Sequence, residues 1–290
     1  MKTPTASLAL CDIIRVMNGA ISPCCLTIAG SDSGGNAGVQ ADLRAFHAYG
    51  VHGCTVFAAL TAQNPHGVSA IHAVPADFVA AQLDAVLGVY DIRGMKTGML
   101  SDPAAIEVIA ARLAAHPEIA KVIDPVMIAT SGVRLVTDET MAVIEKTLLP
   151  LATIMTPNLP EAEALCGFVS DPSSASRAAD SSRTRELALR LYDKFGCAVL
   201  VKGGHGSGAM AVDVLFDGKA FDEFSMPWVA NPVSTHGTGC SLAAALAAEL
   251  ALGRDLSSAV RGAKAYVHDA IERSYLVGEN CGVLGFAPRA

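Results

Sequence analysis

The sequence has few aromatic residues. Phe, Trp and Tyr together make up 5% of the 290 residues, whereas 51% are hydrophobic. The core must therefore be built mainly from Ala, Val, Leu and Ile, a mixture that suits helices packed on a buried parallel sheet. An uncharged stretch over residues 226–248 contains two prolines, two glycines and a His, so we do not expect it to span a membrane.

The chain also lacks an excess of basic residues. Asp and Glu number 28 against 21 Lys and Arg, which gives a formal charge of −7 and a pI of about 5.6. This balance argues against nucleic acid and against an anionic membrane surface as partners. An acidic protein can still bind a phosphate compound if the site itself supplies hydrogen-bond donors.

The eight cysteines contain no C-x-x-C pair and no zinc-like spacing. Reduced thiols in a cytoplasmic enzyme fit this distribution better than a secreted disulfide framework. Asp12 and Arg15 interrupt the apolar stretch near the N-terminus, so no signal peptide is expected there. We expect a flexible extension over residues 1–22 and a single domain over residues 23–290.

Short apolar runs alternate with helical patterns along most of the chain. The expected strands are Cys24–Ala29, Cys54–Leu60, Lys121–Asp124, Ala152–Thr156, Ala198–Lys202 and Val212–Phe216. The expected helices are Ala37–Tyr49, Ala76–Val89, Pro103–His116, Asp138–Leu148, Pro160–Leu165, Thr184–Phe195, Gly239–Leu252 and Leu256–Tyr275. This alternation predicts an α/β fold in which helices cover both faces of a mainly parallel sheet.

Polar or glycine-rich segments follow five of the apolar strands. They occupy residues 30–35, 61–64, 124–127, 156–161 and 202–206. Because ligands bind at the carboxyl ends of the strands in such sheets, we expect these segments to outline one cleft. The first segment matches neither the dinucleotide motif G-x-G-x-x-G nor the P-loop motif G-x-x-x-x-G-K-[ST].

A glycine turn leads directly into a helical pattern at residues 235–240, Thr-His-Gly-Thr-Gly-Cys. Free N–H groups at a helix start bind anions, and Gly237 and Gly239 allow close approach of an oxyanion. A Cys at a helix N-terminus tends to have a lowered pKa, so we expect Cys240 to accept a proton from a substrate hydroxyl. We expect a structural role for His236. The alternative is a helix cap with a small buried Cys.

Other polar residues at the strand ends are suited to a heterocyclic substrate and a nucleotide. The Gln63 amide offers a donor and an acceptor to the edge of a nitrogen ring, and Met99 can pack on such a ring. Asp124 and Glu161 are expected to hold Mg²⁺, and Lys202 to compensate phosphate charge. Turn capping, core packing and surface ion pairing are the ordinary alternatives.

Six motifs in one order make the chain similar to the hydroxymethylpyrimidine/phosphomethylpyrimidine kinases of the ribokinase-like superfamily. The motifs are AGSDSGGNAGVQAD (29–42), AQN (62–64), KTGML (96–100), TPNLPEA (156–162), KGGH (202–205) and HGTGC (236–240). The resemblance covers roughly residues 24–275. It implies a three-layer α/β/α sandwich that is usually a homodimer.

The resemblance also implies an activity and its site. Members use ATP and Mg²⁺ to phosphorylate 4-amino-5-hydroxymethyl-2-methylpyrimidine to its monophosphate and then to the diphosphate, in thiamine diphosphate biosynthesis. The residues implied at the pyrimidine are Gly30, Asp42, Gln63 and Met99. The anion hole and base would be Gly237, Thr238, Gly239 and Cys240, with Cys240 where sugar kinases of the superfamily have an Asp. The nucleotide would contact Asn158, Glu161 and Lys202, and the metal Asp124 and Glu161.

The tail over residues 278–290 differs from the Gly-His-Gly-rich ending of relatives. That ending can approach the active site, so the second phosphorylation is left open. The nearest alternative function is a pyridoxine or pyridoxal kinase, because some relatives with the same Gly-Thr-Gly-Cys turn accept that pyridine alcohol. A ligand-binding regulator without catalysis would need a missing reactive group, and none is missing.

Overall fold

One nine-stranded sheet organises the molecule. The computed structural model describes residues 22–128, 135–168, 181–204 and 210–287. The strand order is β3-β2-β1-β4-β5-β6-β7-β8-β9. Neighbours from β2 to β7 pair in parallel, and β3, β8 and β9 join by antiparallel pairing. The bounds are β1 Cys24–Asp32, β2 His52–Asn64, β3 Gly67–Ala73, β4 Ile92–Thr97, β5 Ala120–Ile123, β6 Ile154–Met155, β7 Ala198–Val201, β8 Met210–Phe216 and β9 Phe221–Pro227.

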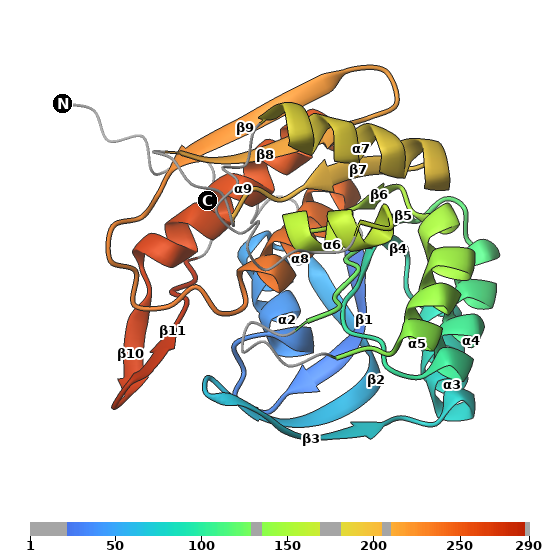
Figure 1. The fold of residues 1–290 in the computed structure, drawn as a ribbon. Coiled ribbons are helices and arrows are strands. Elements are labelled where there is room, and N and C mark those ends of the chain that lie inside the picture. The colour runs from blue at the N-terminus through green and yellow to red at the C-terminus, as the bar shows by residue number, and fades with distance from the viewer. Residues whose placement is uncertain (1–21, 129–134, 169–180, 205–209, 288–290) are drawn as a thin grey trace.

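Helices cover both faces of this sheet (Figure 1). On one face lie α2 Gly38–Ala48, α8 Thr238–Ala251 and α9 Leu256–Glu272. On the other lie α3 Ala76–Leu87, α4 Pro103–Ala114, α5 Asp138–Val143, α6 Leu159–Leu165 and α7 Ser181–Phe195. The expected three-layer α/β/α architecture is therefore confirmed.

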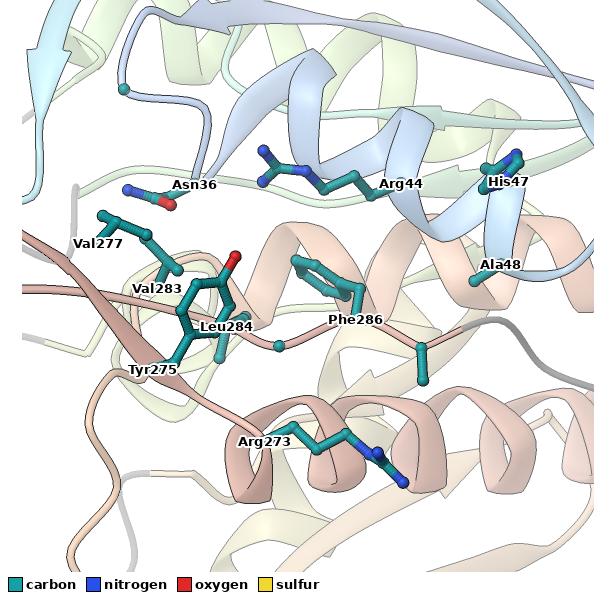
Figure 2. A pocket seen from close by; sticks show the side chains of 13 residues that line it. Asn36, Arg44, His47, Ala48, Arg273, Tyr275, Val277, Val283, Leu284 and Phe286 are labelled. Carbon is teal, nitrogen blue, oxygen red and sulfur yellow. The ribbon is translucent and has the colours of Figure 1, made fainter.

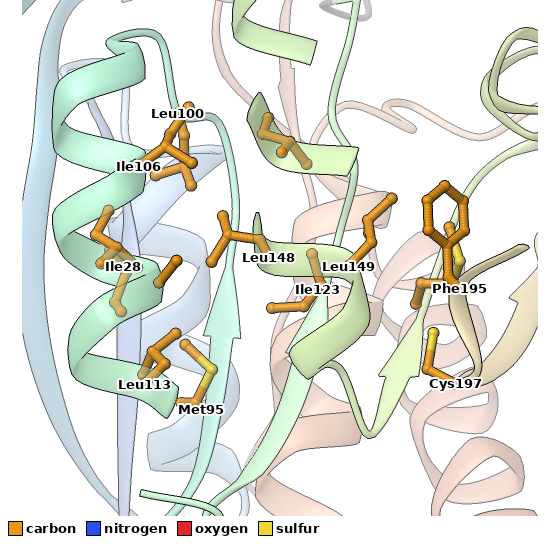
Figure 3. Packing of buried hydrophobic residues seen from close by; sticks show 14 of the residues in the cluster. Ile28, Met95, Leu100, Ile106, Leu113, Ile123, Leu148, Leu149, Phe195 and Cys197 are labelled. Atoms are coloured by element: carbon orange, nitrogen blue, oxygen red, sulfur yellow. The ribbon is translucent and has the colours of Figure 1, made fainter. Parts of the chain in front are cut away.

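The two cores differ in the size of their side chains. On the α4 face, Ile28, Met95 and Ile123 of the sheet pack with larger aliphatic side chains such as Ile106 and Leu148 (Figure 3). On the opposite face, α8 is buried along nearly its whole length and is rich in Ala. Small residues allow α8 to lie very close to the sheet. This close packing fixes the start of α8 at the carboxyl edge of the sheet.

One close contact shows how tightly α8 packs. A Cβ added to Gly94 in β4 would lie 2.4 Å from the Ala247 carbonyl oxygen of α8, so no larger residue fits there. A side chain at this point would push the helix away from the strand. The paucity of aromatic residues in the sequence thus corresponds to a core that depends on close backbone approach.

The eight expected helices are present, with ends that differ by a few residues, but several strands were missed. The β4 segment contains the charged Lys96, and edge strands β3 and β9 are largely exposed, so none has a continuous apolar run. Tyr275, expected to end a helix, instead begins β10 Tyr275–Gly278, which pairs with β11 Cys281–Val283.

The expected extension over residues 1–22 lies almost entirely outside the described residues, and the single domain over 23–290 stays a prediction. Within the parts of the chain that the structure describes, no helix is both long enough and apolar enough to cross a membrane.

Candidate active site

The polar strand-end segments lie along one edge of the sheet, as expected from the parallel strand order. Adjacent strands β2, β1, β4, β5, β6 and β7 all present their carboxyl ends there. The residues brought to this edge are Gly30, Gln63, Met99, Asp124, Asn158, Glu161 and Lys202. His205, from the KGGH motif, lies outside the described residues.

The glycine turn before α8 is locked against the loop that follows β1. Gly237 has φ +89°, and a Cβ there would lie 1.9 Å from the Asn36 carbonyl oxygen. Both the left-handed backbone and the close approach require glycine. The first N–H groups of α8 have no partner within the helix, and Gly237 has no side chain to cap them. The Thr238 N–H donates to the Thr235 carbonyl at 3.4 Å, so Gly239 and Cys240 present the backbone donors at the positive end of the helix dipole.

Cys240 lies on the first turn of α8 between several charged groups. Cys240 keeps part of its surface exposed to solvent. The protein packed around the thiol nevertheless raises its pKa above the ordinary value. The Lys96 ammonium opposes this effect, whereas Asp42 and Asp124 add to it. The expectation of a lowered pKa was therefore wrong, because burial outweighs the Lys96 charge and the hydrogen bond from the Gly38 N–H.

The pair formed by Asp42 and Lys96 is sealed inside the protein. Lys96 Nζ lies 2.9 Å from both carboxylate oxygens of Asp42, and both side chains have 0% exposure. Thr27 Oγ1 donates to Asp42 at 2.6 Å. Burial alone would lower the pKa of Lys96, but Asp42, with Cys240 and Asp124, raises it overall. Asp42, expected beside the pyrimidine, has no exposed surface and acts on its surroundings through Lys96.

Gly30, Met99 and Gln63 lie at the ends of neighbouring strands. A Cβ on Gly30 would lie 2.7 Å from Met99 Cε, so the missing side chain leaves room for the thioether end. Gln63 is half-buried, and its Oε1 accepts a hydrogen bond of 3.1 Å from Thr61 Oγ1. Its backbone N–H and carbonyl both bond to Ser33 Oγ, which ties the end of β2 to the loop after β1.

A second lysine–carboxylate pair lies further along the same edge. Lys202 Nζ is 2.9 Å from Asp124 Oδ1, which also accepts a bond of 2.8 Å from Thr156 Oγ1. The Lys202 side chain retains 14% exposure. A Cβ on Gly239 would lie 3.5 Å from Lys202 Nζ, so this ammonium lies at the start of α8. Asp124 and neighbouring Glu161 raise the pKa of Lys202 in spite of burial, so it is a cation.

Asn158 and Glu161 form the N-terminal cap of α6. Asn158 Oδ1 accepts from the Glu161 N–H at 2.9 Å, and Glu161 Oε2 accepts from the Asn158 N–H at 2.8 Å. Both side chains therefore have a structural role at the cap. Burial raises the pKa of Glu161, and the Asp124 charge adds to this effect.

Two carboxylates are too few for a metal site made of protein alone. The described residues contain no group of three or more His, Cys, Asp or Glu side chains arranged to hold a metal ion. Asp124 and Glu161 fit an ion that arrives with phosphate oxygens and water, which is how Mg²⁺ commonly binds. Asp124 is already hydrogen-bonded by Thr156, which orients its carboxylate.

Sequence analysis missed the roles of three buried charged residues, Asp32, Asp213 and Lys264. Asp32 accepts backbone bonds of 2.8–2.9 Å from three N–H groups of the loop after β1, and His236 Nε2 lies 3.9 Å away. Burial would raise the pKa of Asp32, but the nearby His236 side chain and the backbone hydrogen bonds lower it overall. An Asp before a glycine-rich loop is the signal that predicts a carboxylate hydrogen-bonded to the backbone of that loop.

Asp213 and Lys264 support the end of the edge where Lys202 lies. Asp213 Oδ1 accepts from the Gly203 N–H at 2.8 Å, and Lys264 Nζ lies 2.7 Å from its other oxygen. Both side chains are at most 9% exposed. Because Gly203 follows Lys202, this pair fixes the backbone next to it. Asp213 lies within β8 and Lys264 within α9, where no motif indicates a role.

The chain has close relatives in sequence and structure. Residues 32–285 match the family model described as phosphomethylpyrimidine kinase. The chain is 46% identical over 246 residues to the hydroxymethylpyrimidine/phosphomethylpyrimidine kinase of Rhizobium meliloti, covering 85% of this chain and 89% of that protein. It is 44% identical over 257 residues, 89% of its own length, to the thiamine biosynthesis bifunctional protein ThiED of Geobacter sulfurreducens, of which it spans about half, 51%.

Among solved structures, the ADP complex of Bacillus subtilis pyridoxal kinase superposes with a TM-score of 0.81 at 32% identity. That match covers 92% of this chain and 98% of the other.

Proposed function

This chain belongs to the phosphomethylpyrimidine kinase family, and we propose that it transfers the γ-phosphoryl group of ATP to 4-amino-5-hydroxymethyl-2-methylpyrimidine and then to the resulting monophosphate. The observation that supports this best is the position of Cys240. It lies on the first turn of α8, beside backbone N–H donors, with Lys202 at the same helix start. A proton acceptor, an anion hole and a cation thus converge on one point, as phosphoryl transfer requires.

Each side of this point has its own task. Gly30, Met99 and Gln63 bind the pyrimidine, with the Gln63 amide facing the aminopyrimidine edge and Met99 packing on the ring. Cys240 takes the proton from the hydroxymethyl oxygen as that oxygen attacks the γ-phosphorus. The N–H groups of Gly237, Gly239 and Cys240 and the Lys202 ammonium stabilise the negative charge that develops on the transferred group.

Mg²⁺, when bound with ATP, would neutralise phosphate charge, and Asp124 and Glu161 would hold it directly or through water. Asn158 orients Glu161 through the α6 cap and keeps the strand end beside Lys202. We also propose a homodimer, on the resemblance alone.

The choice between a pyrimidine and a pyridine alcohol depends on the relatives. Identity to the curated pyrimidine kinase of Rhizobium meliloti is 46%, against 32% for the structurally similar pyridoxal kinase. The higher identity favours the pyrimidine.

Product analysis tests the proposed function most directly. The protein is incubated with Mg·ATP and the pyrimidine alcohol, and the products are separated and identified by mass. We expect the monophosphate first and the diphosphate after it. A higher kcat/KM for pyridoxal than for the pyrimidine alcohol would replace the proposed substrate, and ATP hydrolysis without either product would refute the kinase assignment.

Gln63→Ala tests the pyrimidine side. We expect KM for the pyrimidine alcohol to rise about tenfold, the loss of one or two hydrogen bonds, with KM for ATP nearly unchanged. Steady-state kinetics with each substrate varied in turn measure both constants. Gln82→Ala is a matched control, since the Gln82 amide bonds to Phe57 in β2, away from the carboxyl edge. Equal changes in the two KM values would contradict the assignment.

A further inference from the structure

A cavity of about 580 Å³ lies between α2, the end of α9 and the C-terminal tail. Figure 2 shows Arg44 of α2 on one wall and Arg273 on the opposite wall, with Phe286 of the tail between them. The hairpin β10–β11 closes one end with Tyr275 and Val277. Its volume falls within the range of small-molecule sites. None of the residues assigned above to the pyrimidine, the anion hole or the nucleotide lines it.

The lining suits a ligand that carries both an anionic group and an aromatic ring. Its lining includes two arginines, one on each of two opposite walls, and no Asp or Glu. Arginine is suited to phosphate because its planar N–H groups bind two oxygens at once. Tyr275 and Phe286 supply aromatic surface, and Val283 and Leu284 supply aliphatic surface, on which a planar ring can pack.

Arg44 is already held in place for such a role. Its guanidinium donates a hydrogen bond to the Gly35 carbonyl and lies 5.9 Å from the centre of the Phe286 ring. The Phe286 ring in turn stacks on Tyr266 at 5.8 Å. Arg273 is oriented by a bond of 3.0 Å to Asp269. An arginine fixed in this way loses less conformational entropy when it binds a ligand.

The cavity shares one loop with the active site without being part of it. Gly34 and Asn36 line the cavity, and the Asn36 carbonyl also packs against Gly237 of the anion turn. On the tail side, a Cβ on Gly282 would lie 2.4 Å from the carbonyl oxygen of Val233, in the segment that leads to the same turn. A molecule bound here would therefore contact the loop after β1 directly, and the tail that packs against the segment before α8.

We propose that this cavity is a second ligand site, which binds a small aromatic phosphate through Arg44 and Arg273, with the ring against Phe286 and Tyr275. A phosphorylated pyrimidine and a nucleotide share this chemistry. The experiment distinguishes the two by using each as a separate probe.

Isothermal titration of the full-length protein measures the number of molecules bound per chain. The probes are the pyrimidine monophosphate, ADP and inorganic phosphate. We expect at least one aromatic phosphate to bind the wild type with one more molecule per chain than it binds Arg44→Met/Arg273→Met. Inorganic phosphate, without a ring, should bind the extra site at least about tenfold more weakly.

The difference in stoichiometry makes the test independent of the proposed function. If the active site binds neither aromatic probe, the expected counts become one for the wild type and none for the double variant. Equal stoichiometry in the two proteins, for both aromatic probes, would overturn the proposal.

Two further variants separate binding from folding. Arg93→Met is the matched control, since Arg93 is a half-exposed arginine paired with Asp91 and absent from the cavity lining, and it should keep the extra molecule. Val277→Glu places a carboxylate in the cavity from the exposed hairpin and should abolish the extra molecule by repulsion. If Val277→Glu keeps the extra molecule, or Arg93→Met loses it, the proposed site is wrong.

Discussion

Two lysine–carboxylate pairs lie on the same sheet edge. Their nitrogen–oxygen distances are the same, 2.9 Å, but the pairs differ in access to solvent. In the sealed pair, the Lys96 and Asp42 side chains have 0% exposure. In the open pair, the Lys202 side chain keeps 14% exposure and the Asp124 side chain keeps 2%. A sealed ammonium cannot exchange its carboxylate for a ligand, while a partly exposed one can turn to a phosphate. The comparison indicates that equal geometry supports different tasks, structural charge placement in one pair and ligand contact in the other.

Cys240 lies between the two pairs, and the charges of Lys96, Asp42 and Asp124 all act on its thiol. The sealed pair places charge near the Cys240 sulfur, and the open pair places a cation at the start of α8. Breaking each element in turn should therefore separate loss of stability from loss of catalysis.

Removal of the thiol should have the largest effect on catalysis. Cys240→Ala is expected to lower kcat by about 10²–10⁴, the span for a positioned general base. Single-turnover kinetics with the pyrimidine alcohol and Mg·ATP measure the change. Cys166→Ala removes another half-buried free thiol and serves as the control. A kcat for Cys240→Ala within about threefold of wild type would move the base elsewhere.

Breaking the sealed pair should mainly affect stability. Lys96→Met leaves the Asp42 carboxylate buried without its counter-charge, so the free energy of unfolding should fall by about 3–5 kcal/mol. Urea unfolding followed by circular dichroism measures this change. The double variant Asp42→Leu/Lys96→Met should recover much of the loss, because it removes both charges. No difference between the single and double variants would show that the pair is not the cause.

Breaking the open pair should affect activity more than stability. Lys202→Met is expected to lower kcat/KM for ATP by about 10²-fold, and the free energy of unfolding by less than Lys96→Met does, because Lys202 keeps contact with solvent. The same two assays, run beside Lys96→Met, give the comparison directly. Lys202→Arg, which keeps the charge, should recover part of the activity. A larger stability loss than that of Lys96→Met would reverse the interpretation of the two pairs.

The pH dependence should show the raised pKa of the Cys240 thiol. A base must be unprotonated to accept a proton, and a raised pKa leaves the thiol mostly protonated at neutral pH. The value of kcat/KM should therefore rise with pH from about 6 to about 9, by up to about tenfold per unit. Cys240→Asp should flatten this rise, because a carboxylate is already ionised in that range. A flat wild-type profile would contradict the role of the thiol.

The sequence predicted the fold through its alternation of apolar runs and helical patterns. The helices were found because their periodic apolar faces are long. Strand β4 was missed because Lys96 breaks its apolar run, and its burial depends on Asp42, which lies 54 residues away in the sequence. A pairing at such distance leaves no local pattern.

The sequence predicted which loops meet at the candidate site. It did not predict the environment of each side chain there. Motifs located Cys240, Lys202 and Asp124 at one edge, and the structure brings them together. The direction of the thiol pKa depended on burial, which spacing does not reveal. Asp213 and Lys264 were missed because they lie inside regular elements, where charged residues are usually solvent-facing.

The contact between Gly237 and the Asn36 carbonyl has a consequence for synthesis of the chain. The two residues come from opposite ends of the sequence, and α8 is the next-to-last helix. During translation the loop after β1 emerges early and lacks this partner until residue 237 has been synthesised. A nascent chain that stops before α8 can thus form much of its sheet while the Asn36 carbonyl still lacks its contact with Gly237, so this loop reaches its final arrangement late in folding.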